Sequence, residues 1–503
     1  MSDSPGTVNV VQRNPHRITD EEQGLYSLSE TTPTSSQPGI VVEEKEGRPP
    51  PRRKESRSER FLRTGKHTPR TLDSLKALVF SSWLNILLVF IPIAWVAHFS
   101  NQNEEDPERT WSYQATFVLC FMAIVPLEKL LDYGGEQLTF YVGPDIGDLL
   151  VVTFNNIVEG TLAIILLRKC KLRLLQSTII GVVLLHLLLV PGVAFVTGGA
   201  RISEQDLHPH LTQLNQTLLT IGVLTLLLPA AFFAALNRPT QVGEAVADAL
   251  TNDTARANFL KMSRGLAVIL LTVYICSRIF LHNPPGEAKG TNLAEHKLAP
   301  EEFKARALEL QNADPQLNQW VCIGMLAVTI GIMATTAEWL VDSIDFVEEA
   351  GGIGFEWFGL ILLPLVSFSG DGFIAILFFL RSTWRYFRGE DIPAATLANA
   401  QPIDLSIQFT LFWMPFIVLL GWWLGHPMSL LFDMFEVAMV IAACFIVNYV
   451  TADSKTNWAE GWCLLSFYVM IALCTWFYDG QPDVRAMLSC ENVLAALAGG
   501  SEE

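Results

Sequence analysis

The sequence predicts an all-α integral membrane protein, and its composition and hydropathy pattern carry that prediction. Half of the 503 residues are hydrophobic and only 17% are charged, whereas soluble proteins carry about 25% charged residues. The apolar residues form long blocks, each near the roughly 20 residues with which an α-helix crosses a bilayer. The pattern therefore indicates a bundle of spanning helices surrounded by membrane lipid, and it excludes a soluble enzyme.

About eleven transmembrane helices are expected, because eleven apolar blocks are long enough to span. Short polar segments separate them, except for one long polar stretch after the sixth block. The predicted spans are 77–99, 113–132, 146–168, 174–197, 212–235, 262–282, 319–341, 354–381, 405–424, 430–450 and 461–479.

The balance of charge and the cysteines exclude other classes of protein. With 34 basic and 51 acidic residues, the formal net charge is −17, which argues against a nucleic-acid partner. The eight cysteines form no Cys-x-x-Cys pair. We therefore expect them to be small buried hydrophobic residues, not disulfide or metal ligands.

Five segments follow from these patterns. Residues 1–75 are rich in Pro, Ser, Thr, Glu and Arg and predict a disordered tail. Residues 76–282 hold the first helix and one half of the bundle, and 319–480 hold the other half. Between the halves lies a polar loop, 283–318, and a C-terminal tail covers 481–503.

The basic stretch before the first span predicts a cytosolic N-terminus. Residues 52–76 carry nine Lys or Arg and three acidic residues, and such segments stay in the cytosol by the positive-inside rule. The same orientation places the loop 283–318 in the cytosol. One basic segment, 168–173, then falls on the far side and breaks the rule once.

Two polar clusters inside spans are the candidate functional sites, since ionisable groups within a membrane are costly. The first contains Asn156 and Glu159, which are three residues apart and so share a helix face. The second runs from Ser367 through Ser369 to Asp371. Glycines flank Asp371, so we expect the helix to break there and to offer backbone carbonyls.

A carboxylate in each half is the pattern of a secondary transporter with internal repeats, whose ion site lies at the midplane between broken helices. Carboxylate, amide and hydroxyl oxygens suit a hard cation such as Ca²⁺. The same carboxylates can take up protons, which gives a chemical basis for exchange. The alternative is that these polar residues serve helix packing alone.

From about residue 76 to 480 the chain resembles the cation/proton exchanger family, the vacuolar Ca²⁺/H⁺ antiporters of fungi and plants, within the sodium/calcium exchanger superfamily. The order and spacing of several strings carry the resemblance, together with the eleven spans. They include 84–92, 121–127, 226–232, 337–344, 359–364, 431–433, 448–450 and 457–461. The family fold that the resemblance implies contains two inverted repeats.

The resemblance also assigns the site. The Gly-Asn-x-x-Glu motif of each repeat falls on 155–159 and on 367–371, which implies that Glu159, Asp371 and Asn156 bind the cation and the proton. In the second motif Phe368 stands where the family has Asn, and Asp371 stands where it has Glu. Phe368 therefore removes one oxygen ligand, and Asp371 reaches less far than Glu.

Four further residues are secondary candidates. Ser367 and Ser369 offer oxygens that can compensate for the lost ligand. Gln408 ends a remnant of the family string Gly-Ser-Ser-x-Gln. His186 lies where the family has a Ser-Asn pair, and it is either a packing histidine or a proton carrier.

The resemblance implies a cation/proton antiporter, not an enzyme, with no cofactor beyond the transported Ca²⁺ and H⁺. By alternating access it would move cytosolic Ca²⁺ into the vacuole, from a vacuolar membrane location. Two alternatives stay open. The loss of Asn at Phe368 suggests a monovalent cation or Mn²⁺/H⁺ exchanger, and a paralogue could keep the scaffold without transporting.

Overall fold

The computed structural model describes residues 61, 69–100, 111–199, 204–236, 253–282, 314–344, 346–347, 352–388, 401–491 and 493. Most of the predicted tail 1–75 and of the predicted loop 283–318 therefore lies outside the described residues. The contacts divide the chain into Met1–Lys54 and Glu55–Glu503. All elements below belong to the second unit.

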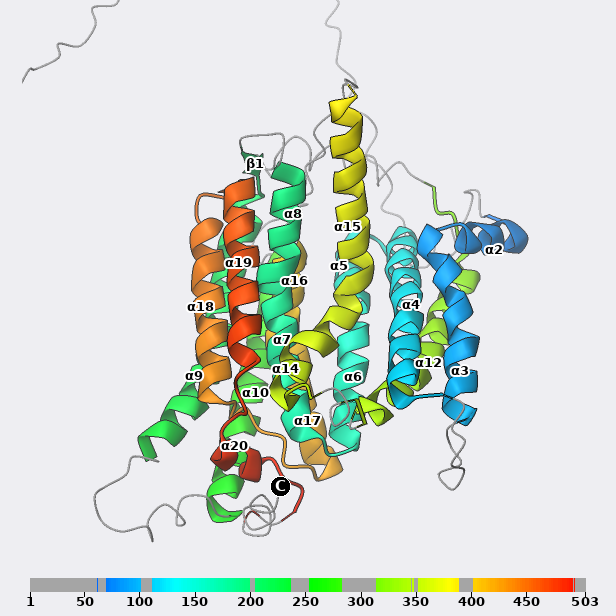
Figure 1. Cartoon of the computed structure of the whole chain (residues 1–503). Helices are drawn as coiled ribbons and strands as arrows, with labels where there is room; N and C mark the ends of the chain where they lie inside the picture. Colours follow the sequence, from blue (N-terminus) through cyan, green and yellow to red (C-terminus); the bar gives the residue numbers. More distant parts are fainter. Residues whose placement is uncertain are drawn as a thin grey trace, which may run out of the picture. The chain divides into compact units, whose positions relative to one another are not determined.

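The described part of the chain is built almost entirely of helices (Figure 1). The helices of the first half are α2 (Thr71–Val79), η2 (Trp83–Val89), α3 (Phe90–Ser100), α4 (Tyr113–Val142), α5 (Pro144–Asn155), α6 (Ile157–Arg168), α7 (Leu172–Leu184), η3 (Leu185–Leu189), α8 (Val190–Gly199), α9 (Pro209–Leu236) and α10 (Asp253–His282). Those of the second half are α12 (Gln319–Asp342), α14 (Phe355–Trp357), η6 (Phe358–Leu362), α15 (Leu363–Phe387), α16 (Gln401–Gln408), η7 (Phe409–Trp413), α17 (Met414–Leu424), α18 (Met434–Val450), α19 (Trp458–Thr475) and α20 (Pro482–Met487).

These helices confirm the predicted all-α membrane class. Eight of them are long and apolar enough to cross a bilayer, and two bent helix pairs raise the number to ten. Helix α18 is apolar but has 17 residues, so a count of eleven spans stays a prediction. Large apolar side chains such as Ile86, Phe445 and Val469 are more than half exposed, as expected where a helix faces lipid.

Several predicted spans have different bounds in the structure; the span predicted at 262–282, for example, begins at Asp253. The predicted span 77–99 is interrupted, because α2 ends at Val79 and a new helix begins at Trp83, where the Ser82 hydroxyl caps Leu84 N (3.2 Å). The predicted span 113–132 continues to Val142. The helix continues through its charged residues, because Glu128 is buried and Lys129 is paired within the helix.

The helix packing repeats between the two halves. Helix α4 packs along α12 and α9 along α18, which are equivalent helices of the two halves. Helix α8 of the first half packs on α19 of the second half. Their counterparts, α17 of the second half and α10 of the first, pack together in the same way. Each of these helices thus has a counterpart in the other half, as two repeats require.

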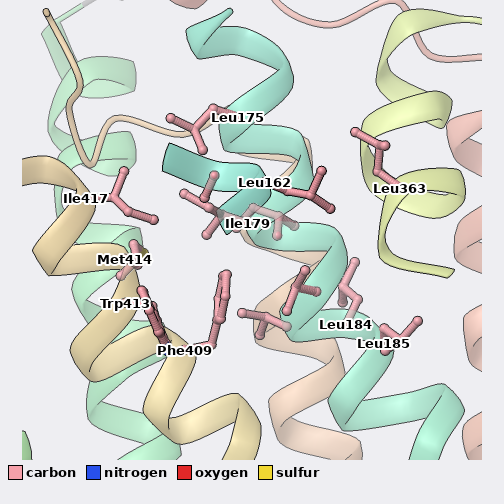
Figure 2. Close-up of a cluster of buried hydrophobic side chains, with 14 of the residues drawn as sticks. Leu162, Leu175, Ile179, Leu184, Leu185, Leu363, Phe409, Trp413, Met414 and Ile417 are labelled. Carbon is pink, nitrogen blue, oxygen red and sulfur yellow. The ribbon is translucent and has the colours of Figure 1, made fainter. Parts of the chain in front are cut away.

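A buried apolar cluster joins the halves beside the bent helices. It contains Leu162 of α6, Ile179 of α7, Leu363 of α15 and Met414 of α17 (Figure 2). The halves approach closely there because small residues face large ones. A β-carbon at Gly160 would lie 2.7 Å from the Trp413 ring, so glycine lets that ring lie against α6.

Three spans contain a π-helical turn, and a proline follows each one. The turns are η3, η6 and η7, and Pro191, Pro364 and Pro415 lie two residues after their ends. Proline has no N–H and clashes with the carbonyl four residues earlier, which favours a wider turn at that point. Such turns are frequent at functional sites, and η6 lies one turn before the second polar cluster.

Two short links lie at the ends of the bundle. Strand β1 (Gln205–Asp206) pairs antiparallel with β2 (Lys455–Thr456), so the α8–α9 and α18–α19 connections lie together at one end. At the other end a disulfide joins Cys170, between α6 and α7, to Cys490 near the C-terminus.

This disulfide corrects the expectation that the cysteines form none. Cys120, Cys322 and Cys444 are buried and free, as expected, whereas Cys276, Cys463 and Cys474 are free but exposed. The pair is separated by 320 residues, so only the fold brings its members together. No local spacing could have indicated it.

Candidate cation site

The first polar cluster lies at a break in a spanning helix. Helices α5 and α6 meet at Asn156 with a bend of 54°. Asn156 is fully buried, and its amide nitrogen donates to Leu405 O (3.2 Å) and to Gln408 Oε1 (2.8 Å). The bend of the first half is thus bound directly to α16 of the second half.

Gln408 holds this arrangement in place. Its Oε1 accepts from Asn156, and its Nε2 donates to the Thr153 hydroxyl (2.9 Å) and to the Tyr274 hydroxyl (3.1 Å). Both the oxygen and the nitrogen of the Gln408 amide are therefore engaged in hydrogen bonds within the protein. Asn156 Oδ1, in contrast, accepts no hydrogen bond from the described part of the chain, so it is available to a cation.

Glu159 lies in the first turn of α6, one turn after Asn156, and is 2% exposed. The positive end of the α6 dipole favours a carboxylate at this position. The Ser367 side chain of α15 lies beside the carboxyl group. Its Oε2 has no hydrogen-bond donor among the described residues. Glu159 thus presents a carboxylate oxygen between the two halves.

The second polar cluster lies at a matching break. The segments Phe355–Gly370 and Gly372–Arg385 meet with a bend of 58°, so the helix bends at Asp371, as its flanking glycines predict. The backbone of Asp371 belongs to α15, while its side chain lies outside what the structure describes. Breaks of this kind free backbone carbonyls for ion binding.

The two serine hydroxyls of this cluster donate their hydrogen bonds to backbone carbonyls of their own helix. Ser367 Oγ donates to Pro364 O (3.0 Å), and Ser369 Oγ donates to Val366 O (2.9 Å). Their oxygen lone pairs stay available. The half-buried Phe368 ring packs along its own helix, since a β-carbon at Gly372 would lie 2.7 Å from Phe368 Cε1. Phe368 therefore contributes shape but no ligand to this bend.

A charged pair that was not predicted from the sequence lies between the two bends. On α4, Lys129 Nζ lies 2.7 Å from Asp132 Oδ2, and the side chains are 10% and 24% exposed. When the Asn155 amide is oriented so that its oxygen and its nitrogen both have suitable partners, its nitrogen donates to Asp132 Oδ1 (2.8 Å). Lys129 Cε lies 3.3 Å from where a β-carbon of Gly370 would be. A Lys-x-x-Asp pattern inside an apolar helix was the available signal.

A second ion pair that was not predicted from the sequence helps to position Gln408. Arg278 of α10 binds Asp404 of α16 (2.8 Å), with side chains 12% and 14% exposed. The Arg278 guanidinium lies over the Tyr274 ring, 4.8 Å from its centroid. Tyr274 in turn binds Gln408. The pair thus fixes the helix turn that carries Gln408.

His186 lies in the π-helical turn η3 and is 5% exposed. Turn η3 packs against α16, which carries Gln408, and against α15, which carries the second bend. The structure therefore brings Asn156 and Gln408 into contact and Glu159 beside Ser367. It places His186 on a neighbouring turn.

Two inverted halves, each with a spanning helix broken at a polar motif, define an integral membrane protein of the exchanger class. The family model for sodium/calcium exchanger proteins matches residues 111–282 and 321–477. The chain belongs to this family.

Relatives and a solved structure agree with this membership. The chain is 30% identical over 490 residues to a vacuolar calcium ion transporter of Cryptococcus neoformans, covering 84% of this chain and 78% of that one. It is 30% identical to a Ca²⁺/H⁺ antiporter of Synechocystis, covering 78% and 96% of the two chains. The fold is similar to native YfkE, with a TM-score of 0.56 at 20% identity, covering 78% and 100% of the two chains.

Proposed function

We propose that the chain exchanges Ca²⁺ for H⁺ and that Glu159 and Asp371 carry both ions. The observation that carries the proposal is a carboxylate residue at or within one turn of a helix break in each half. Ca²⁺ takes six to eight oxygen ligands, and Asn156 Oδ1, Ser367, Ser369 and the freed carbonyls are candidates for the remainder. The family membership and the names of the relatives support Ca²⁺ and H⁺ as the substrates.

The exchange follows from competition for the same oxygens. Deprotonated carboxylates bind Ca²⁺, and protonation removes the negative charge that holds it. Because the site lies between the two halves, rocking of one half against the other would expose it to each side in turn. A proton gradient then drives Ca²⁺ toward the acidic compartment, which we propose is the vacuole.

We propose a cytosolic N-terminus. The basic segment 168–173, which breaks the positive-inside rule, is neutralised in part by ion pairs of Lys169 with Asp342 and of Arg173 with Glu356. The Cys170–Cys490 disulfide lies on the same side, and disulfides persist in non-cytosolic compartments. An N-terminal tag that proteases reach only after sealed vacuoles are opened would contradict this orientation.

Flux in reconstituted vesicles tests the proposal. With an acidic interior, the purified chain is expected to take up ⁴⁵Ca²⁺ and release protons, and a protonophore should abolish the uptake. Equal uptake with and without the chain under a verified gradient would support the non-transporting alternative instead.

Phe368 tests the choice between Ca²⁺ and other cations. Phe368→Asn restores an amide oxygen to the second motif, so we expect Ca²⁺ to compete more strongly against Mn²⁺, Na⁺ and K⁺, by about tenfold for one added ligand. The measurement is ⁴⁵Ca²⁺ uptake with each competitor in turn. Phe368→Leu, which removes the ring without adding a ligand, is the matched control. An unchanged cation preference in Phe368→Asn would exclude this position from selectivity.

Lys129 gives an independent test of where the cation binds. Its ammonium lies beside the second bend, so Lys129→Gln removes a positive charge that repels the cation. We expect half-maximal uptake at a several-fold lower Ca²⁺ concentration. Lys129→Arg keeps the charge and should resemble the original chain, and Lys129→Gln with Asp132→Asn should return toward it. If Lys129→Gln reaches half-maximal uptake at the same Ca²⁺ concentration as the original chain, the pair does not influence the cation.

A further inference from the structure

Three segments that are distant in the sequence meet at the Cys170–Cys490 disulfide, and each brings a side chain that can bind a metal. The turn between α6 and α7 brings Cys170, the turn after α17 brings His426, and the C-terminal segment brings Cys490. Their two sulfurs and one imidazole nitrogen all lie within 4.8 Å of one another. Within the described ranges, no other group of three histidine, cysteine or acidic side chains is close enough to hold a metal ion.

The backbone fixes the position of Cys170, because this residue closes α6. Its N–H donates to Leu167 O (3.1 Å), and the N–H of Lys171 donates to Leu166 O (3.0 Å). Cys170 takes a left-handed φ of 58°, a conformation that helices usually give to glycine at this position. A side chain costs energy in this conformation, which points to a use for the sulfur at this turn.

His426 is positioned by a turn of the same kind. Gly425 ends α17 with a left-handed φ of 79°, and the N–H of His426 then donates to Gly421 O (2.9 Å). The carbonyl of His426 accepts from Met428 N (2.9 Å). The half-buried imidazole is therefore held beside the sulfurs, with its Nδ1 3.5 Å from Cys490 Sγ.

The peptide groups on both sides of Cys490 are held by α10. Arg256 Nη1 donates to Ser489 O (2.9 Å) and to Glu491 O (2.7 Å). All three side chains are thus attached to backbone that is fixed by hydrogen bonds, so the fold brings them together without the disulfide. Cys490 is exposed, which gives an ion and water access to the group.

The ligand set indicates which metal fits. Zn²⁺ is four-coordinate and binds thiolates and imidazole, and a site with three protein ligands keeps water in the fourth position. Two thiolates also neutralise the charge of one Zn²⁺. Ca²⁺ prefers oxygen ligands, so this group differs in chemistry from the carboxylates at the two bends.

We propose that Cys170, Cys490 and His426 bind one Zn²⁺ when the disulfide is reduced. A dithiol reductant breaks the S–S bond, supplies two electrons and two protons to form two thiols, and becomes a disulfide itself. Zn²⁺ then displaces both thiol protons, which pass to water. The disulfide and the zinc site are two forms of one clasp that holds the C-terminal segment to the α6–α7 turn. The inference does not rest on transport at Glu159.

Cobalt absorption in the purified full-length chain tests the site. Co²⁺ occupies Zn²⁺ sites and absorbs visible light strongly when thiolates bind it in tetrahedral geometry, which carboxylates at Glu159 cannot imitate. At neutral pH, with a phosphine reductant, we expect one such Co²⁺ per chain, displaced by Zn²⁺. Cys490→Ser should abolish the absorption, and His426→Ala should weaken Co²⁺ binding at least about tenfold.

Cys474→Ser is the matched control, because Cys474 is also exposed but free and lies on α19. This variant should bind Co²⁺ like the original chain. No thiolate absorption in the reduced chain, or undiminished absorption in Cys490→Ser, would overturn the proposal. Equal Co²⁺ affinity in His426→Ala would exclude His426 and with it the three-ligand site.

Thermal unfolding gives a second readout that does not depend on absorption. Zn²⁺ should raise the unfolding temperature of the reduced chain, and both Cys170→Ser and Cys490→Ser should abolish the rise. Without metal, these variants should unfold at the temperature of the reduced original chain, since none of them has the bridge. An equal effect of Zn²⁺ on either variant or on the oxidised chain would contradict the site. Failure of transport at Glu159 would leave these results unchanged.

Discussion

Replacing Glu159 by Gln is expected to reduce proton-driven Ca²⁺ uptake to the level of vesicles without protein. The amide keeps the size of the side chain and its place in the first turn of α6, but it carries no charge and cannot exchange a proton. Glu159 is 2% exposed, so water cannot replace the carboxylate oxygen that the amide nitrogen displaces. Initial rates of ⁴⁵Ca²⁺ uptake under an imposed pH gradient provide the measurement.

Two further variants separate the loss of charge from a loss of folding. Glu159→Asp keeps the negative charge on a side chain that is one methylene shorter, so it should retain part of the uptake. Glu460→Gln is the matched control, because Glu460 closes the capping box at the start of α19 and Gln can do the same. Undiminished uptake by Glu159→Gln, with Glu460→Gln equally active, would sink the proposed mechanism.

The fold class could be predicted because it depends on features that the chain displays locally. Long apolar blocks require helices in a membrane, and glycines beside Asp371 predicted the bend of α15 that the structure shows. The break at Asn156 carried no such signal, since neither glycine nor proline is adjacent to it. It depends on the amide contacts of Asn156 with Leu405 and Gln408.

The parts that could not be predicted depend on contacts between distant residues. Asn156 and Gln408 were candidates for separate reasons, but their hydrogen bond joins residues 252 positions apart. Lys129 and Asp132 lie where the predicted span 113–132 ends, but the helix continues because paired charges can lie inside a bundle where each neutralises the other. A cavity lined by Glu356, Asp433 and Glu436 draws on α7, α14, α18 and the C-terminal segment, which no single motif connects.

Gly181 is where we expect a single methyl group to have the largest effect on the fold. A β-carbon there would overlap the carbonyl oxygen of Leu360 and would lie 2.7 Å from Pro364 Cγ. The clash is with the backbone of η6, so no side-chain rotation relieves it. Overpacking of this kind costs about 1–3 kcal/mol, and sometimes more. Because η6 leads into Ser367, separation of α7 from η6 would also displace the second polar cluster.

Gly181→Ala should therefore lower the unfolding temperature in detergent by several degrees and reduce Ca²⁺ uptake more than the loss of folded protein explains. Gly331→Ala is the matched control, because a β-carbon at that position of α12 meets nothing within 4 Å. Alanine is also the better helix former, so this variant should be as stable as the original chain. Equal unfolding temperatures for the two variants would show that α7 and η6 are not held together by the close approach at Gly181.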